Sequence, residues 1–584
     1  MVNRRKAGPV FGPRNLSRPD ILPIAETIEL PAALDIRALG FYTQPPAPTV
    51  PLPIPVPSRR DQGYVPSWRR TALSRLSLLA ILCLQAVLSL RLHNTAFEDE
   101  ALYLYVGRLE TAHLLHGAPL AGSYAAFFSG APVLYPVLAA ALNAVGGLAL
   151  ARGLSLVEML AITAMLYSCT RFLFNERTAL CSAALFSVAM PVLFLGNFAT
   201  FDATCLFLLA SAATIAVRTS RSRWPLFLLA APVAALAVAV KYAGLLFVPT
   251  IAVLTILAGW PAMRGWAGRH RAWLVVLYPA AFCAIVGGLL YGALLLGGHD
   301  YLTALSSTTT ARAAGTTPVL TVLRESGQWG GIIAGLAAFG SVAYARRVRT
   351  EPDELIAPAG GPVRRVLLGA VLTGTALLAP AYQLHLHTDI SLHKHVGFGL
   401  FFAAPMAGLG LARLVGDHFR RPQIGIAVWS AALALGMMQS VDLSQGWPSS
   451  GPFVKALSAY LEPSARYLVE VPEVPVYYLE GRADAQASQF YSTFAIAYQA
   501  DDRRVLTGID GFTAAVRAGY FHVIAYNGDV TPPTDTAIAK VLAASHAYRL
   551  ATVVHLTDSA GPVTYHIWVK RPPPPKRHHS AARH

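Results

Sequence analysis

The sequence predicts an α-helical protein that crosses a membrane many times, with about eleven spans, followed by a C-terminal α/β domain outside the membrane. Three observations predict this class. Hydrophobic residues make up 54% of the 584 residues and charged residues only 13%, and the mean hydropathy is +0.47. The net charge of +16 comes from short basic clusters between apolar stretches, which is typical of cytoplasmic membrane loops and not of a nucleic-acid-binding surface.

The chain begins with a polar lead, residues 1–70, that is rich in proline and carries scattered arginines. This composition predicts a disordered cytoplasmic arm, with partner binding as an open alternative. The first apolar stretch begins near residue 71, so we expect a retained membrane anchor and not a cleaved signal peptide. All five cysteines lie in apolar stretches, which predicts neither a disulfide framework nor a cysteine-rich metal site.

A helix that spans a membrane needs roughly 20 mostly apolar residues. Residues 71–440 contain eleven such candidates and are predicted to form the membrane domain. The candidates are 71–91, 153–172, 178–197, 203–217, 224–240, 243–260, 272–296, 328–345, 365–384, 396–414 and 422–440.

The stretch 131–150 is ambiguous, because it is apolar enough to span the membrane. Excess lysine and arginine marks cytoplasmic loops, and nearly every arginine cluster falls on the side of the N-terminus if 131–150 does not span. We therefore place it in a first outer loop, 92–152, with juxtamembrane helices. The N-terminus is then cytoplasmic and the C-terminus lies outside.

Two segments follow the predicted spans. Residues 441–570 mix short alternating runs with helical patterns and are predicted to form the extracytoplasmic α/β domain. Presenting an acceptor and acting as a structural lid are both open roles for it. Residues 571–584 are a basic tail rich in proline and histidine, which we expect to be solvated.

This topology places the scarce polar residues of the membrane domain at one face, the outer one. Ionisable groups at a membrane are costly and are candidates for function. Glu98, Asp99 and Glu100 follow the first span directly and would repel one another, and a helical pattern that contains Tyr103 and Arg108 comes next. A solvated acidic loop is the alternative interpretation of the three acids.

Several short segments, in this order, resemble the GT-C glycosyltransferases, in particular the branch with protein O-mannosyltransferases and the lipid A aminoarabinose transferase. The resemblance covers about residues 70–440. It rests on the segments 97–108 with the pattern Asp-Glu-x-x-Tyr, 117–120, 131–136, 150–155, 201–203, and 240–242 followed by Pro249.

The resemblance implies an inverting glycosyltransferase that moves a sugar from a polyprenyl-phosphate carrier to a glycan, lipid or protein at the outer face of the cell membrane. Asp99 would be the general base, because a carboxylate can accept the proton of the attacking hydroxyl. Glu100 and Asp202 would support it. The expected partners are the lipid-linked donor, the acceptor and membrane lipids, but no nucleic acid.

A phosphate leaving group needs cations or hydrogen-bond donors nearby. Lys241 and Lys394 lie on the predicted outer side, and Arg152 needs an anionic partner such as Asp99 or the lipid phosphate. Lys241 could instead extend to the headgroups, and Asp202 could serve only as a helix N-cap. The remaining candidates for substrate binding are Glu98, Tyr103, Arg108, Tyr135, Tyr242 and His393.

The run 385–395 contains four histidines and Asp389. We expect phosphate or acceptor binding by His393 and Lys394, with interfacial anchoring as the alternative. No metal ligand and no cofactor are predicted, although a divalent cation stays an open alternative. Residues 117–135 contain no lysine or arginine, which departs from the aminoarabinose transferases and leaves the sugar unassigned.

Two other functions remain open. A secondary transporter would also carry ionisable groups within many spans, but it typically has two related halves with charges near mid-membrane, and this chain has neither. A non-catalytic membrane scaffold could share the same fold. A nucleotide-sugar enzyme is disfavoured, because the sequence contains neither a glycine-rich phosphate loop nor an Asp-x-Asp triplet.

Overall fold

The computed structural model describes residues 68–120, 124, 128–220, 226–260, 268–346, 361–416, 419–480 and 485–572. The predicted cytoplasmic arm, up to residue 67, and the predicted tail, from residue 573, lie outside the described residues. The described residues belong to one compact unit, Pro66–His584.

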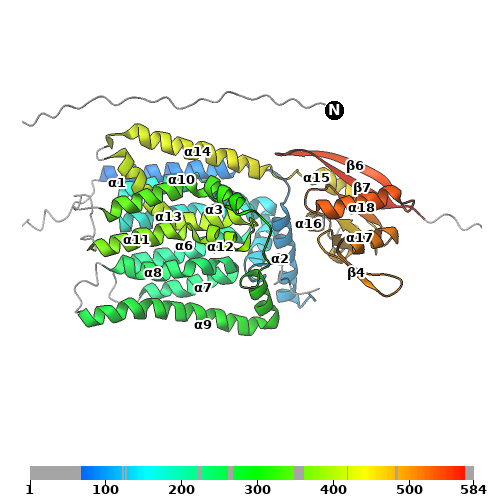
Figure 1. Cartoon of the computed structure of the whole chain (residues 1–584), viewed down its shortest axis with the longest axis horizontal. Coiled ribbons are helices and arrows are strands. Elements are labelled where there is room, and N and C mark those ends of the chain that lie inside the picture. Colours follow the sequence, from blue (N-terminus) through cyan, green and yellow to red (C-terminus); the bar gives the residue numbers. More distant parts are fainter. Residues whose placement is uncertain are drawn as a thin grey trace, which may run out of the picture. The chain divides into compact units, whose positions relative to one another are not determined.

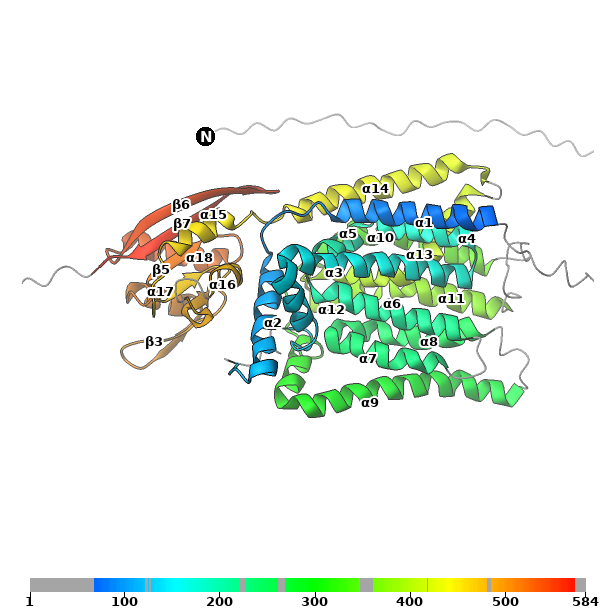
Figure 2. The ribbon, with the colours of Figure 1, turned by 180° about the vertical axis from the view of Figure 1, so that it is seen from behind.

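The larger part of this unit is a bundle of helices, most of which run side by side (Figures 1 and 2). They are α1 (Trp68–Ser89), α2 (Glu98–His116), α3 (Tyr135–Leu173), α4 (Glu176–Ser187), α5 (Met190–Asn197), α6 (Phe201–Thr219), α7 (Ala230–Val240), α8 (Val248–Gly259), α9 (Gly268–Thr308), α10 (Val319–Ala345), α11 (Gly361–Thr375), α12 (Leu378–Leu386), α13 (Leu392–Val415) and α14 (Pro422–Ser444), with the 3₁₀ helices η3 (Leu226–Leu229) and η4 (Tyr242–Phe247).

Seven of the described helices are long and apolar enough to cross a membrane, or nine if the bent pairs α4–α5 and α11–α12 count as one span each. These nine correspond to nine of the eleven predicted stretches. The other two stretches form the shorter apolar helix Leu226–Val240 and the second part of α10. The predicted class, a helical multi-pass membrane protein, is confirmed.

The ambiguous stretch 131–150 forms the beginning of α3 and not a separate span. At a rise of 1.5 Å per residue, the 39 residues of α3 would be far longer than the hydrocarbon core of a membrane, which is about 30 Å thick. The backbone leaves helical geometry at Gly146 and Gly147, where φ reaches 67° at Gly147. This break separates a short first part from a long second part of α3.

Helix α13 lies at the centre of the bundle and is buried over most of its length. It packs against α10 and α4. A Cβ atom on Gly410 would lie 2.3 Å from the carbonyl oxygen of Leu336 in α10, so the two backbones touch, as small residues allow in membrane bundles. This packing fixes the position of Lys394 in the first turn of α13.

Helix α2 runs across the ends of the long helices (Figure 2). Its middle packs directly on the beginning of α3, because Gly107 has no side chain. A Cβ atom at Gly107 would lie 1.9 Å from the Pro136 carbonyl oxygen. The close approach of α2 to α3 therefore holds the acidic first turn of α2 against the bundle.

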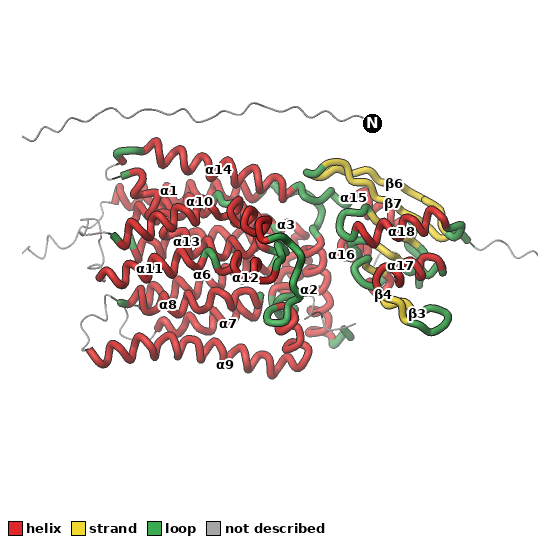
Figure 3. Tube along the Cα trace, viewed as in Figure 1, coloured by secondary structure: helices red, strands yellow, loops and turns green. Residues whose placement is uncertain are grey.

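The strands of the described chain lie in its C-terminal part (Figure 3). A five-stranded sheet has the order β2-β1-β5-β7-β6. Strands β2, β1 and β5 are parallel to one another, and β7 is antiparallel to both of its neighbours, β5 and β6. The elements are α15 (Gly451–Ser458), β1 (Tyr467–Val469), α16 (Glu473–Leu479), η7 (Ala487–Gln489), β2 (Phe490–Ser492), β3 (Ala497–Gln499), β4 (Val505–Thr507), α17 (Gly508–Arg517), β5 (Val523–Tyr526), α18 (Pro532–Ala544), β6 (Tyr548–Asp558) and β7 (Gly561–Lys570).

Helices cover both faces of this sheet. Leu468 and Ile524 point into one core, with α17 and α18, whereas Tyr467 and Val523 point into the other core, with α15 and α16. This alternation is the two-residue period of a strand. Coverage of both faces explains why β1 and β5 are buried along their whole length and do not alternate between apolar and polar residues as predicted.

Glu470 organises the edge of the sheet at the carboxyl end of β1. Its buried carboxylate accepts the backbone N–H groups of Asn527, Gly528, Val530 and Thr531 at 2.6–3.1 Å. These N–H groups form a concave nest of the kind that binds anions. The N–H groups of the loop after β5 thus bind the Glu470 side chain of the same domain in place of an external anion.

The contact between α2 and α3 gives a first prediction. Gly107→Ala should lower the midpoint of thermal unfolding in detergent, because an added methyl group in such a tight contact costs about 1–3 kcal/mol. Gly153→Ala in α3 is the matched control, since a Cβ atom there meets nothing within 4 Å. Equal midpoints for the two variants would contradict the close packing of α2 on α3.

Candidate active site

The first turn of α2 carries Asp99 at the edge of the bundle. Three acids begin this helix, where the helix dipole favours negative charge. Lys394 Nζ, from the first turn of α13, donates to Asp99 Oδ2 at 2.6 Å. Among the described residues this is the one hydrogen bond recorded for the Asp99 side chain. Asp99 is therefore held in place by one oxygen and is free to act with the other.

A second acid–base pair lies behind the first. Asp202, in the first turn of α6, is fully buried and forms an ion pair with Lys241, which is itself 3% exposed. Lys394 Nζ also lies 4.0 Å from Asp202 Oδ2. We call these four residues, Asp99, Lys394, Asp202 and Lys241, the buried charge row. Alternating signs let each buried charge keep an opposite partner.

The structure supports neither the N-cap role of Asp202 nor the extension of Lys241 to the headgroups. Thr200, and not Asp202, is the N-cap of α6, so Asp202 is not the cap. Lys241 does not extend towards headgroups, because its ammonium group lies against Asp202 and 4.5 Å from the centre of the Phe201 ring.

A cavity of about 620 Å³ opens next to the charge row. Five of the predicted site residues line it. They are Asp99, Tyr103, Lys241, Tyr242 and Lys394. Tyr103 lies in α2, and burial raises the pKa of its hydroxyl well above the ordinary value, so this phenol stays neutral and can donate a hydrogen bond.

The cavity also contains polar residues that the sequence analysis missed. Arg312 lies on the wall together with Tyr382, His385, Ser391 and His395. It is half-buried, and the described residues supply no ion-pair partner for it. The signal was present in the sequence, since Arg312 falls in a predicted outer loop and breaks the positive-inside bias as Arg152 does.

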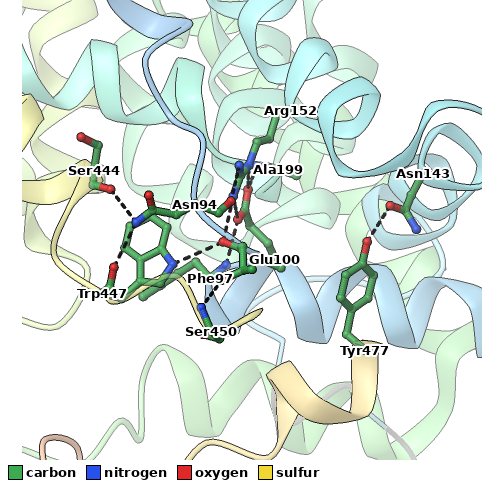
Figure 4. Close-up of polar contacts among 12 residues, drawn as sticks. Asn94, Phe97, Glu100, Asn143, Arg152, Ala199, Ser444, Trp447, Ser450 and Tyr477 are labelled. Carbon is green, nitrogen blue, oxygen red and sulfur yellow. Dashed lines mark hydrogen bonds and ion pairs between the residues drawn. The ribbon is translucent and has the colours of Figure 1, made fainter. Parts of the chain in front are cut away.

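Glu100 and Arg152 form a clamp instead of lining the cavity (Figure 4). Arg152 donates to both oxygens of Glu100, at 2.8 and 2.6 Å, and also to the carbonyl oxygens of Asn94 and Thr95. The fully buried Glu100 carboxylate accepts the N–H groups of Ala199 and Phe97 as well. The Glu100 carboxylate thus accepts four hydrogen bonds, and four of the five N–H groups of Arg152 are engaged. This arrangement favours a structural role for the pair, and the predicted support of Asp99 by Glu100 stays a prediction.

Three further predicted site residues lie outside the cavity. Arg108 is 41% exposed and contacts Glu480 of the C-terminal domain at 3.5 Å. Tyr135 is buried with its ring edge-on to Tyr103. The ring of His393 packs edge-on against Phe194. None of these three residues lines the cavity, and their predicted contact with a substrate stays a prediction.

Glu98 does not line the large cavity either, although it adjoins Asp99. Burial and the charges of Asp99 and Glu473 raise the pKa of Glu98, Lys394 lowers it, and the net result is a rise to about 7. Glu473, at the start of α16, likewise has a raised pKa, mainly through burial. The sequence analysis missed Glu473, which brings a carboxylate of the C-terminal domain near the reaction site.

The histidines and carboxylates of the described chain do not gather into a metal site. Within the described ranges, no three histidine, cysteine, aspartate or glutamate side chains are arranged to hold a metal ion. The histidines of the run 385–395 separate: His385 and His395 line the cavity, whereas His393 lies among aromatic rings.

Part of the bundle matches a protein-family model. Residues 131–287 fit the model described as dolichyl-phosphate-mannose-protein mannosyltransferase. The predicted resemblance to GT-C glycosyltransferases is confirmed. The matched stretch contains Arg152, Asp202 and Lys241, and thus one half of the buried charge row. A search of curated proteins found no match.

The solved structures that match this chain are distant in sequence. The apo oligosaccharyltransferase of Archaeoglobus fulgidus is 12% identical, with a TM-score of 0.49 over 85% of this chain and 75% of that chain. ArnT from Cupriavidus metallidurans is 14% identical in its apo state, with a TM-score of 0.36 over 85% and 98% of the two chains. A structure of ArnT bound to undecaprenyl phosphate has a TM-score of 0.35 at 13% identity and the same coverage.

The clamp yields a second prediction. Arg152→Met should cost about 3–5 kcal/mol of stability, because it leaves the buried Glu100 carboxylate without its partner. Arg171→Met is the matched control, since Arg171 in the same helix pairs with Glu176 but is half exposed, and exposed pairs contribute about 0–1 kcal/mol. Size-exclusion chromatography after heating in detergent measures the folded fraction. Equal losses for both variants would contradict the structural role of the clamp.

Proposed function

We propose that this protein is an inverting glycosyltransferase that transfers a sugar from a polyprenyl-phosphate carrier to an acceptor hydroxyl at the outer face of the cell membrane. One observation carries the proposal: a single cavity combines a carboxylate, three cations and an apolar flank. The match to a family of dolichyl-phosphate-mannose-protein mannosyltransferases supports the donor class. The positive-inside bias of the loops supports the outer face.

The charges around the cavity fit the charge of such a donor. Lys241, Lys394 and Arg312 carry three positive charges, and Asp99 and Asp202 carry two negative charges, so one positive charge is in excess among the described residues. A sugar phosphodiester carries one negative charge. Its binding would make the site neutral, which favours entry of the donor into a partly desolvated cavity.

The same charge balance holds after the reaction. The acceptor oxygen attacks the anomeric carbon on the face opposite the phosphate, the carbon–oxygen bond to the phosphate breaks, and Asp99 takes the hydroxyl proton. The released phosphate monoester carries a charge close to −2, while Asp99 has become neutral. Lys394 lies close to Asp99 and Asp202, and its ammonium group can move its hydrogen bond from Asp99 to the leaving phosphate.

The apolar flank of the cavity suits an isoprenoid chain. Its wall includes Leu245, Leu246, Pro249 and Ile390. Leu245 is 46% exposed and Ile390 is 64% exposed, so the apolar wall continues onto the outer surface of the helices. A polyprenyl chain could remain in the membrane while its phosphate reaches the cations.

Asp99→Asn tests the central assignment. It should lower turnover by about 10²–10⁴, the contribution of a general base, while the fold is retained, because Asn can still accept from Lys394. The assay would use purified protein in nanodiscs, a panel of polyprenyl-phosphate monosaccharides and cell-envelope extract as acceptor, with released carrier phosphate as the readout.

Asp510→Asn, on the exposed start of α17, is the matched control for this assay. Unchanged turnover in Asp99→Asn would exclude Asp99 as the base. If the wild type turned over none of the donors but moved solutes across vesicles, a transporter would replace the transferase. The absence of both activities would favour a scaffold.

Arg312 gives a further prediction. Arg312→Gln should raise the KM for the donor about ten- to a hundredfold, because a charge-assisted hydrogen bond contributes about 1.5–3 kcal/mol, with a smaller effect on kcat. Arg324→Gln, at an exposed position of α10, should leave both constants unchanged. Equal KM values for the two variants would show that Arg312 does not contact the phosphate.

A further inference from the structure

A second, smaller cavity of about 160 Å³ adjoins the first turn of α2. Two consecutive residues separate the cavities: Asp99 lines the large one and Glu98 lines the small one. We propose that the small cavity is the acceptor subsite and that it takes an uncharged, hydroxyl-rich group of the size of one sugar ring. This inference rests on the proposed function and names the acceptor class for the same reaction centre.

The lining of the small cavity is acidic. Glu98, Asp529 and Asp558 contribute carboxylates, and none of the described residues that line it is lysine, arginine or histidine. The anion-binding nest at its sheet edge is already filled by Glu470. A phosphorylated or carboxylated acceptor would face like charges without a compensating cation, which costs binding energy.

The hydrogen-bonding groups and rings of the cavity match a sugar. Asp529 accepts from Asn527 Nδ2 with one oxygen, and its other oxygen can accept from a sugar hydroxyl. Aromatic residues supply flat apolar faces for the C–H groups of a ring: Phe97 and Trp447 lie with ring centres 5.1 Å apart, and Tyr565 completes the lining. Pockets with apolar walls and a few placed polar groups are typical ligand sites.

The position of the cavity in the fold is a second, independent argument. The connection from β1 to β2 runs to one side of β1, and the connection from β2 to β5 returns to the other side, so β1 lies at a topological switch point. Ligands of open α/β sheets bind outside the carboxyl ends of the strands at such a point. Val469 at the end of β1 and Asn527 after β5 line the cavity there.

A series of aromatic contacts connects the small cavity with the charge row. The Phe97 ring lies 6.0 Å from Phe198, Phe198 stacks on Phe194 at 4.3 Å, and Phe194 contacts His393, the neighbour of Lys394. Phe194 and Phe198 are buried, so these ring contacts fix the position of the small cavity relative to the charge row. The two cavities come closest in the chain at Glu98 and Asp99.

A binding experiment tests the proposal without relying on turnover. Full-length protein in nanodiscs would be examined by saturation-transfer NMR with methyl α-mannopyranoside as the uncharged probe and methyl α-mannopyranosiduronate, which has a free carboxylate, as the anionic probe. We expect the uncharged probe to bind at least tenfold more tightly than the uronate. Asp529→Lys, a change at an exposed position, should reverse this preference, whereas Asp510→Lys should not change it.

The outcomes separate this inference from the proposed function. Equal binding of the two probes, or an unchanged preference in Asp529→Lys, would overturn the acceptor subsite even if the donor is turned over. A preference that Asp529→Lys reverses, in a protein that turns over no donor, would support the sugar site and overturn the transferase.

Discussion

The buried charge row is the interaction on which the site depends. Charges taken out of water are costly unless each has a close opposite partner, and here Asp99, Lys394, Asp202 and Lys241 alternate in sign where α2, α6, α13 and the start of η4 meet. The requirement for these pairs fixes how the helices can pack. It also leaves one unengaged carboxylate oxygen at the cavity, which is the property a general base needs.

Helix α2 connects the two halves of the proposed reaction. Its first turn presents Asp99 to the large cavity and Glu98 to the small one, and the Glu100–Arg152 clamp holds the same turn against the bundle. The three consecutive acids that would repel one another in isolation thus have three different environments. Donor and acceptor can be brought together because neighbouring residues of one helical turn face different cavities.

Composition and apolar periodicity were sufficient to predict the helical bundle, because a membrane span is a local property of about 20 residues. Two parallel strands of the C-terminal sheet, β1 and β5, lie in runs that the sequence analysis interpreted as alternating, whereas β2 was not recognised. Partners were harder to predict: Arg152 was recognised as needing an anion, but its choice of Glu100 over Asp99 depends on the orientation of one helical turn. Arg312 was missed because its role follows from a cavity wall built by segments far apart in the sequence.

The distances along the chain between charge partners have a consequence for biosynthesis. The fully buried Asp202 is paired with Lys241, only 39 residues later, so its partner enters the membrane shortly after it during N-to-C synthesis. Asp99, whose side chain is 27% exposed, is paired with Lys394, which is synthesised 295 residues later. The partly exposed Asp99 can stay hydrated during that interval, whereas the fully buried Asp202 obtains its partner early. The order of synthesis is therefore compatible with the burial of each acid.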